Sequence, residues 1–91
     1  MKYSIVMPVY KRLDVIDFSL KSIESQELKP FELIVVDNNV DSQESENLNE
    51  IIKKFQKKTN ISSQIINSPK NSGSIARNIG AKFAKGDFIA F

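Results

Sequence analysis

Three short segments of this sequence carry side chains that could bind a ligand. The run 37–39 (Asp-Asn-Asn) follows the mostly apolar stretch 32–36 and would place a carboxylate and two amides at the end of a buried strand. Ligands of open α/β sheets bind at the carboxyl ends of the strands. A second segment, 8–10 (Pro-Val-Tyr), also follows an apolar run, and a third, 71–78, contains a glycine and the guanidinium of Arg77. Together the three segments indicate a nucleotide site.

The side chains of Asp37, Tyr10 and Arg77 suit different parts of a nucleotide. An ionised carboxylate only accepts hydrogen bonds, so Asp37 matches the ring N–H of uracil or thymine, or the amino and imino edge of guanine, better than adenine. Tyr10 could stack on a base, and Arg77 offers a planar fork of donors for phosphate oxygens. Structural alternatives remain, because Asp37 could cap a turn, Tyr10 could pack, and Arg77 could pair with Asp87 or Glu24.

The composition excludes several kinds of site. The chain has 91 residues with no cysteine and no histidine, so any acid-base or metal work falls to carboxylates. The net charge is +2 and the 13 Lys and Arg residues are spread along the chain, which does not favour a nucleic-acid partner. No apolar stretch approaches the roughly 20 residues of a membrane span, and the N-terminus does not read as a signal peptide. We therefore expect a cytoplasmic location for this segment, with membrane association of a longer parent protein left open.

The spacing of apolar residues predicts strands that alternate with helices. Strands are expected at about 3–7, 32–37, 62–67 and 87–91. One helix is expected after Tyr10, a second after the polar loop that follows Asp37, and a third from about 72–74 to Gly86. The first two helices each carry one apolar stripe, formed by Leu13, Ile16, Leu20 and Ile23 and by Leu48, Ile51, Ile52 and Phe55. This order predicts an α/β fold, a three-layer α/β/α sandwich with a mostly parallel sheet of order 3-2-1-4.

Local signals refine the second and third helices. Asp41 and Glu44 have the spacing of a capping box at the start of the second helix. In the third helix, larger apolar residues fall one turn apart and two small residues allow close packing; these are Ile75, Ile79 and Phe83, and Gly80 and Ala84. We expect the small residues to bring this helix close to the sheet.

Two common phosphate-binding motifs are missing. The segment 8–12 has no glycine to admit a pyrophosphate after the first strand, so the usual dinucleotide fingerprint is absent. The segment from Gly73 to Gly80 lacks both the spacing and the lysine of the phosphate loop. Phosphate would have to be bound by Arg77, by lysines or by a metal ion.

Four blocks of the sequence carry a family resemblance that covers essentially all of the chain. They are 4–10 (Ser-Ile-Val-Met-Pro-Val-Tyr), 32–39 (Glu-Leu-Ile-Val-Val-Asp-Asn-Asn), 71–80 (Asn-Ser-Gly, then Ala-Arg-Asn and a further glycine) and 86–91 (Gly-Asp-Phe-Ile-Ala-Phe). In this order and spacing they resemble the N-terminal part of the inverting glycosyltransferases of family 2, which have the Rossmann-like GT-A fold.

The resemblance implies a site for a nucleoside diphosphate sugar, often a uridine one, over the strand ends. Pro8, Val9 and Tyr10 would line the base pocket. Asp37 would hydrogen-bond the pyrimidine ring, and Arg77 would lie near the nucleotide.

The sequence departs from the family at the residues that follow Asp37. Many members have aspartate, glycine and serine where this chain has Asn38, Asn39 and Val40. We count Asn39 among the nucleotide-binding residues, and the departure leaves the base and sugar preference open.

The resemblance also places the remaining machinery beyond Phe91. A divalent cation, Mg²⁺ or Mn²⁺, would be held by an Asp-x-Asp-type motif a few residues further on, and the general base would follow later. We therefore expect 1–91 to be the nucleotide-binding N-terminal part of a GT-A domain, inactive alone, from an enzyme that transfers a sugar to a saccharide or lipid-linked acceptor. An exposed sheet edge would favour a homodimer. The alternative is a noncatalytic α/β binding or interaction module, in which Asp37 and Arg77 are only loop and surface groups.

Overall fold

The chain folds as strands alternating with helices, as the sequence predicts. The computed structural model describes residues 2–11, 13–39, 41–68 and 73–90. The elements in chain order are β1 (Tyr3–Val9), α1 (Leu13–Glu24), β2 (Glu32–Asp37), α2 (Ser42–Thr59), β3 (Ser62–Asn67), α3 (Gly73–Phe83) and β4 (Phe88–Ala90). Within the described helices, none is both long and apolar enough to cross a membrane.

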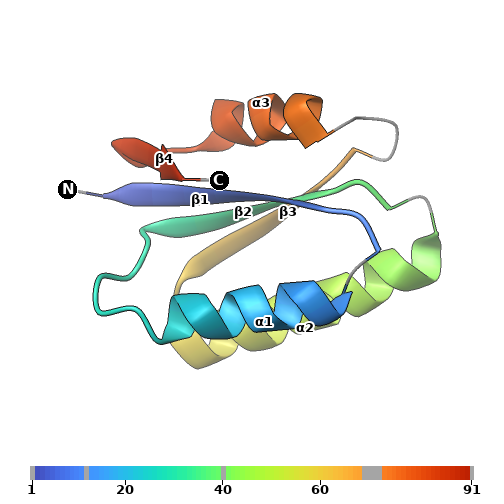
Figure 1. Ribbon diagram of the computed structural model, residues 1–91, viewed down its shortest axis with the longest axis horizontal. Coiled ribbons are helices and arrows are strands. Elements are labelled where there is room, and N and C mark those ends of the chain that lie inside the picture. Colours follow the sequence, from blue (N-terminus) through green and yellow to red (C-terminus); the bar gives the residue numbers. More distant parts are fainter. Residues whose placement is uncertain (1, 12, 40, 69–72, 91) are drawn as a thin grey trace.

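The four strands form one parallel sheet in the order β3-β2-β1-β4, which confirms the predicted order. In register, Val9 lies beside Asp37, and Asp37 lies beside Asn67. Helices α1 and α2 cover one face of the sheet and α3 covers the other (Figure 1), so the three-layer architecture is also confirmed. Because every helix returns the chain to the start of the next parallel strand, the strands end and the helices begin at the same edge.

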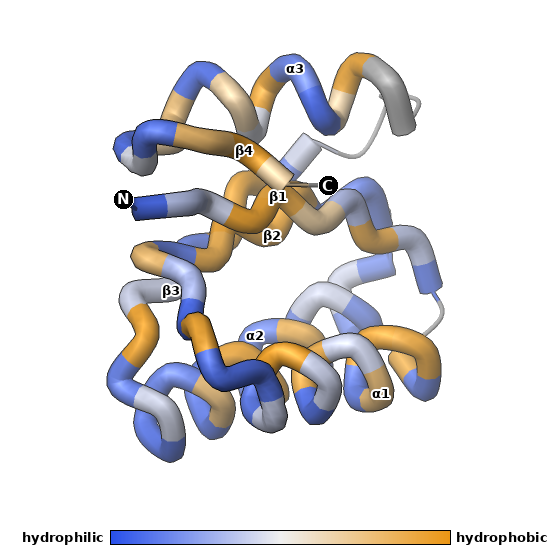
Figure 2. Tube along the Cα trace, turned by 60° about the vertical axis from the view of Figure 1, so that its left-hand side comes forward, coloured by the Kyte–Doolittle hydropathy of each residue, from blue (hydrophilic) through white to orange (hydrophobic). Residues whose placement is uncertain are grey.

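Two apolar layers hold this sandwich together. Under α1 and α2 the buried core consists of Val9, Ile16, Leu20, Ile23, Leu33, Val35, Leu48, Ile52, Phe55 and Ile61. Both predicted apolar stripes supply this layer, and only Leu13 and Ile51 remain half-buried. Figure 2 shows the hydrophobic segments concentrated in β1, β2 and β4 and on turns of α1 and α2. Strand β2 is buried on both faces, as its almost continuously apolar sequence indicates, whereas β1 alternates buried and half-buried residues.

The second layer, under α3, is built from small residues. Ala76 is fully buried against Val6, Ile34 and Val36, and Gly80 is buried beside it. The larger apolar residues of this helix face outward, since Ile75 and Phe83 are 47% and 49% exposed. The predicted close packing is therefore confirmed, and the small residues are what make it.

We predict that Gly80→Ala destabilises the fold. A Cβ at this position would lie 2.3 Å from Val6 Cγ1 and 3.2 Å from Val36 Cγ2, so the added methyl overlaps a buried side chain. Alanine favours a helix by about 1 kcal/mol over glycine, but we expect overpacking to win and to lower the unfolding free energy by about 2 kcal/mol in urea titrations.

The exposed Asn78→Ala on the same helix is the matched control and should not destabilise. A double variant that also carries Val6→Ala should lose less than the sum of the two single losses, because the overlapping methyl is gone. Wild-type stability of Gly80→Ala would contradict the close packing described here.

A buried polar network ties β4 to the start of the sheet. The carboxylate of Glu32, which is 5% exposed, accepts hydrogen bonds from Ser4 Oγ at 2.7 Å and from the Lys85 amide. Ser4 Oγ in turn accepts the Gly86 amide at 2.9 Å. A Cβ on Gly86 would lie 2.6 Å from Ser4 Oγ, so glycine is required for this close approach.

Several predicted boundaries are corrected by the structure. Helix α3 ends at Phe83, not at Gly86, because Gly86 is held against Ser4 instead of closing the helix. Strand β1 continues past the predicted end at residue 7 to Val9, because β2 pairs with it along that whole length. Strand β4 begins at Phe88, one residue later than predicted, and the last residue of the predicted strand, Phe91, lies outside the described residues.

Only half of the predicted capping box of α2 forms. Asp41 is the N-cap and accepts a hydrogen bond from the Gln43 amide at 2.8 Å. Glu44, the expected reciprocal partner, keeps a buried carboxylate oxygen without a partner among the described residues. The helix ends at Thr59, and the C-cap that follows, Asn60, has a φ of 61°, the left-handed conformation common after helices.

Candidate functional site

The carboxyl ends of β1, β2 and β3 are joined by main-chain hydrogen bonds. The Asn38 amide donates to the Val9 carbonyl at 2.8 Å, and the Ser68 amide donates to the Asp37 carbonyl at 2.8 Å. These bonds continue the sheet past the ends of the strands. The residues that follow β2 are therefore held in place by backbone on both sides.

Asp37 lies at the centre of this edge and is almost completely buried, with 1% of its surface exposed. One carboxylate oxygen, Oδ1, accepts the Asn39 amide at 2.9 Å and closes a turn. The other oxygen, Oδ2, is buried with no hydrogen-bond partner among the described residues. Leaving such a buried polar atom without a partner costs about 1–3 kcal/mol, so a ligand that donates to Oδ2 would recover that energy.

The two asparagines after Asp37 are buried as well. Asn38 and Asn39 are 7% and 5% exposed. Asn38 Oδ1 and Asn39 Nδ2 have no hydrogen-bond partner among the described residues. The end of β2 thus holds three buried polar atoms that have no partner among the described residues, one on each of three successive residues.

Tyr10 and Lys11 form the turn that leaves β1. Tyr10 is 56% exposed, and the Lys11 ammonium lies 5.3 Å from the centre of its ring. Lys11 has a φ of 63°, the left-handed region that non-glycine residues rarely adopt. Its amide donates to Asn39 Oδ1 at 2.6 Å. The turn therefore brings an exposed aromatic ring, with a cation beside it, next to the carboxyl end of β2, where Asp37 is buried.

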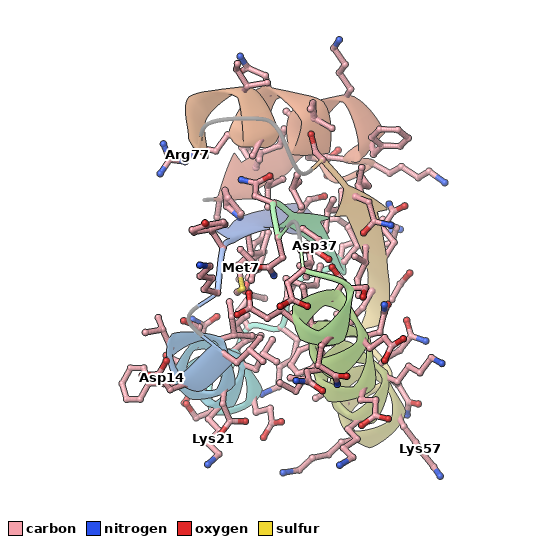
Figure 3. All side chains as sticks on the ribbon, turned by 90° about the vertical axis from the view of Figure 1, so that its right-hand side faces the viewer. Met7, Asp14, Lys21, Asp37, Lys57 and Arg77 are labelled. Carbon is pink, nitrogen blue, oxygen red and sulfur yellow. The ribbon has the colours of Figure 1, made fainter. Side chains whose placement is uncertain are left out.

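Arg77 lies apart from these residues. It is exposed on α3, and Figure 3, which views the strand ends, shows its side chain directed outward while Asp37 lies at the centre. Neither surface pairing considered for Arg77 forms, since Glu24 pairs with Lys58 at 3.2 Å and Asp87 accepts the Lys2 amide. The role of Arg77 near a nucleotide stays a prediction, and Asn71 lies outside the described residues.

The edge where the strands end combines charges of both signs, because the helix N-termini meet the carboxylates of Asp14 in α1 and of Asp41 and Glu44 at the start of α2. The N-termini of α1, α2 and α3 all lie at the edge where the strands end (Figure 1), and the N-terminal end of a helix carries a partial positive charge. Residues 2–11, 13–39, 41–68 and 73–90 contain no group of three or more acidic side chains that could hold a metal ion.

The structure places five of the six predicted site residues at or next to one edge. Val9, Tyr10, Asp37 and Asn39 lie at the joined strand ends, and Pro8 precedes them in β1. Sequence reasoning placed Asn38 among the polar side chains at the end of β2 but did not count it as a nucleotide-binding residue. It missed Lys11, which nothing in the sequence marks, because left-handed turns are usually signalled by glycine or asparagine.

A groove beside the site continues along the α1 face of β1. It has a volume of about 420 Å³ and includes Tyr3, Ile5, Met7, Pro8, Phe18 and Ala90. Phe18 is 76% exposed at its rim. Apolar surface thus extends from the site toward the edge strand β4.

Comparisons with known proteins agree on one family. Residues 4–91 match the family described as "Glycosyl transferase family 2". Among curated relatives, the uncharacterized glycosyltransferase YwdF of Bacillus subtilis strain 168 is 38% identical over 90 residues, which are 98% of this chain and 31% of YwdF. A poly(ribitol-phosphate) beta-glucosyltransferase of Bacillus spizizenii is 35% identical over 95 residues, covering all of this chain and 14% of that protein.

A solved structure has the same fold. The crystal structure of S. aureus TarS 1-349 superposes with a TM-score of 0.77 at 29% identity, covering 100% of this chain and 26% of the TarS chain. The chain spans 31% of the length of YwdF and 14% of the length of the poly(ribitol-phosphate) beta-glucosyltransferase.

Proposed function

The chain belongs to glycosyl transferase family 2 and has the GT-A fold, and from this we propose that its strand-end site binds the nucleoside diphosphate part of a sugar donor. The whole protein would transfer the sugar from that donor to a saccharide or lipid-linked acceptor. The relative named poly(ribitol-phosphate) beta-glucosyltransferase supports a role in building polysaccharides. The cytoplasmic location stays a prediction.

The observation that carries this proposal is the buried Asp37 oxygen that has no partner in the part of the chain that the structure describes. Oδ2 can only accept, so it suits a ligand with a ring N–H, and uracil presents one between two carbonyl groups. The exposed Tyr10 ring could lie against the flat face of the same base. We therefore propose a UDP-type donor.

The diphosphate would lie near the groups of the site that carry positive charge. These are the helix N-termini and the Lys11 ammonium, and Arg77 could supply a further cation if its side chain turns inward. A divalent cation, Mg²⁺ or Mn²⁺, would need ligands from a longer protein.

Titration of the ¹⁵N-labelled 91-residue chain with UDP, GDP and TDP tests the proposal. We expect amide shifts confined to Tyr10, Lys11 and the run 37–39, with UDP binding most tightly. Silence up to millimolar nucleotide, or shifts spread over distant helices, would contradict it. That result would favour the alternative, a noncatalytic α/β interaction module. We expect no sugar transfer by this chain alone.

We further propose that the chain forms a homodimer through β4. This edge strand is exposed along its length, with Phe88 and Ile89 56% and 40% exposed, and an unpaired edge is a template for another strand. Sedimentation at rising concentration should show a dimer, and Ile89→Lys should abolish it because a charge blunts the edge. Gln64→Lys on the opposite edge strand β3 is the control. A monomer at every concentration would contradict the proposal.

A further inference from the structure

Lys11 occupies a backbone conformation that its side chain disfavours. Its φ of 63° is left-handed, and a residue with a Cβ is strained there where glycine is not. Lys11 directly follows Tyr10, the exposed aromatic residue at the end of β1. A strained residue persists only where neighbouring groups hold it, so some contact must stabilise this turn.

A short chain of hydrogen bonds that starts at Asp37 supplies this contact. Asp37 Oδ1 accepts the Asn39 amide at 2.9 Å, and Asn39 Oδ1 accepts the Lys11 amide at 2.6 Å. The bond between Asn39 and Asp37 is buried and the bond between Lys11 and Asn39 is partly buried, so water competes little for the first and only in part for the second. The carboxylate and the strained turn are therefore coupled through one asparagine.

We propose that Asn39 is a positioning residue that holds the Tyr10–Lys11 turn beside Asp37 before the nucleotide arrives. This inference rests on the proposed function and changes the role expected for Asn39, which acts on the turn through its side-chain oxygen. The Lys11 amide fixes which end of the Asn39 amide is oxygen. Preorganising both walls of a site removes an ordering cost that binding would otherwise carry.

The effect of Asn39→Ala in two backgrounds separates positioning from direct contact. In the wild-type background we expect UDP affinity to fall about tenfold, because Lys11 relaxes to negative φ and takes Tyr10 with it. In the Lys11→Gly background the same change should cost less than about threefold, because glycine adopts the left-handed turn without help.

Lys11→Ala is the matched control background. It removes the same ammonium but keeps the backbone strain, so the full loss of about tenfold should persist there. Equal losses in all three backgrounds would overturn the proposal and make Asn39 a direct ligand-contacting residue. An unchanged affinity of Asn39→Ala in the wild-type background would overturn it too.

A measurement without nucleotide distinguishes this inference from the proposed function. In the free protein, exchange of the Lys11 amide hydrogen should be slowed by its bond to Asn39 and should become fast in Asn39→Ala. If UDP does not bind to the wild type but the protection of the Lys11 amide is lost in Asn39→Ala, the proposed function is wrong and the positioning role of Asn39 is supported. If the Lys11 amide already exchanges fast in the wild type, the inference is wrong.

Discussion

Glu32→Ala is expected to lower the unfolding free energy by about 3–4 kcal/mol. The carboxylate is buried and accepts two hydrogen bonds, from Ser4 Oγ and from the Lys85 amide. Hydrogen bonds to charged groups contribute about 1.5–3 kcal/mol each, and alanine would leave both donors without an acceptor. The loss should be measured as a reduced urea midpoint with an unchanged slope.

Two variants show whether the network is responsible. Glu27→Ala removes the same side chain from an exposed position and should change stability by less than about 0.5 kcal/mol. Glu32→Gln keeps an accepting oxygen and should lose about half as much as the alanine variant. The prediction fails if Glu32→Ala is as stable as Glu27→Ala.

Asp37→Asn is expected to weaken UDP binding by about 10- to 100-fold with little loss of stability. The asparagine oxygen can still accept the Asn39 amide and keep the turn, but the group in the place of Oδ2 becomes a donor. A donor facing the ring N–H of uracil loses a charge-assisted hydrogen bond, which is worth about 1.5–3 kcal/mol.

The base preference should change with it. Cytosine presents an acceptor where uracil has the ring N–H, so the ratio of UDP to CDP affinity should fall in Asp37→Asn. Asp41→Asn makes the same change of charge four residues away and keeps a good helix cap, so it controls for net charge. If both variants bind UDP like the wild type, Asp37 does not contact the base.

The layered fold could be predicted from the sequence because its signals are strong and repeated. Continuous apolar runs mark β1 and β2, and regular stripes mark α1 and α2. The ends of elements were less predictable because tertiary contacts set them. Gly86 reads as a helix stop, yet its real constraint is the approach to Ser4, a residue 82 positions away.

The site could be predicted in part, for a similar reason. Asp37 is visible in the sequence because it ends an apolar strand. The strained backbone of Lys11 and the orientation of the Asn39 side-chain oxygen cannot be seen in the sequence. The two are joined by a hydrogen bond between residues 28 positions apart, so each conformation depends on the other. Arg77 shows that a predicted position on a helix does not fix the direction of the side chain. The residue lies on α3 as expected, yet its side chain points to solvent.

The pairing of β1 with β4 has a consequence for the order of folding. Ser4 pairs with Glu32, only 28 residues away, whereas Tyr3 pairs with Phe88, 85 residues away. Closing the longer loop costs about 1 kcal/mol more chain entropy, and only three residue pairs reward it. We therefore expect β1, β2 and β3 to form the nucleus of folding and β4 to join last. In the folded protein, β4 should correspondingly be the first strand to detach. The hydrogen bonds around Glu32 therefore determine how long the complete four-stranded sheet persists.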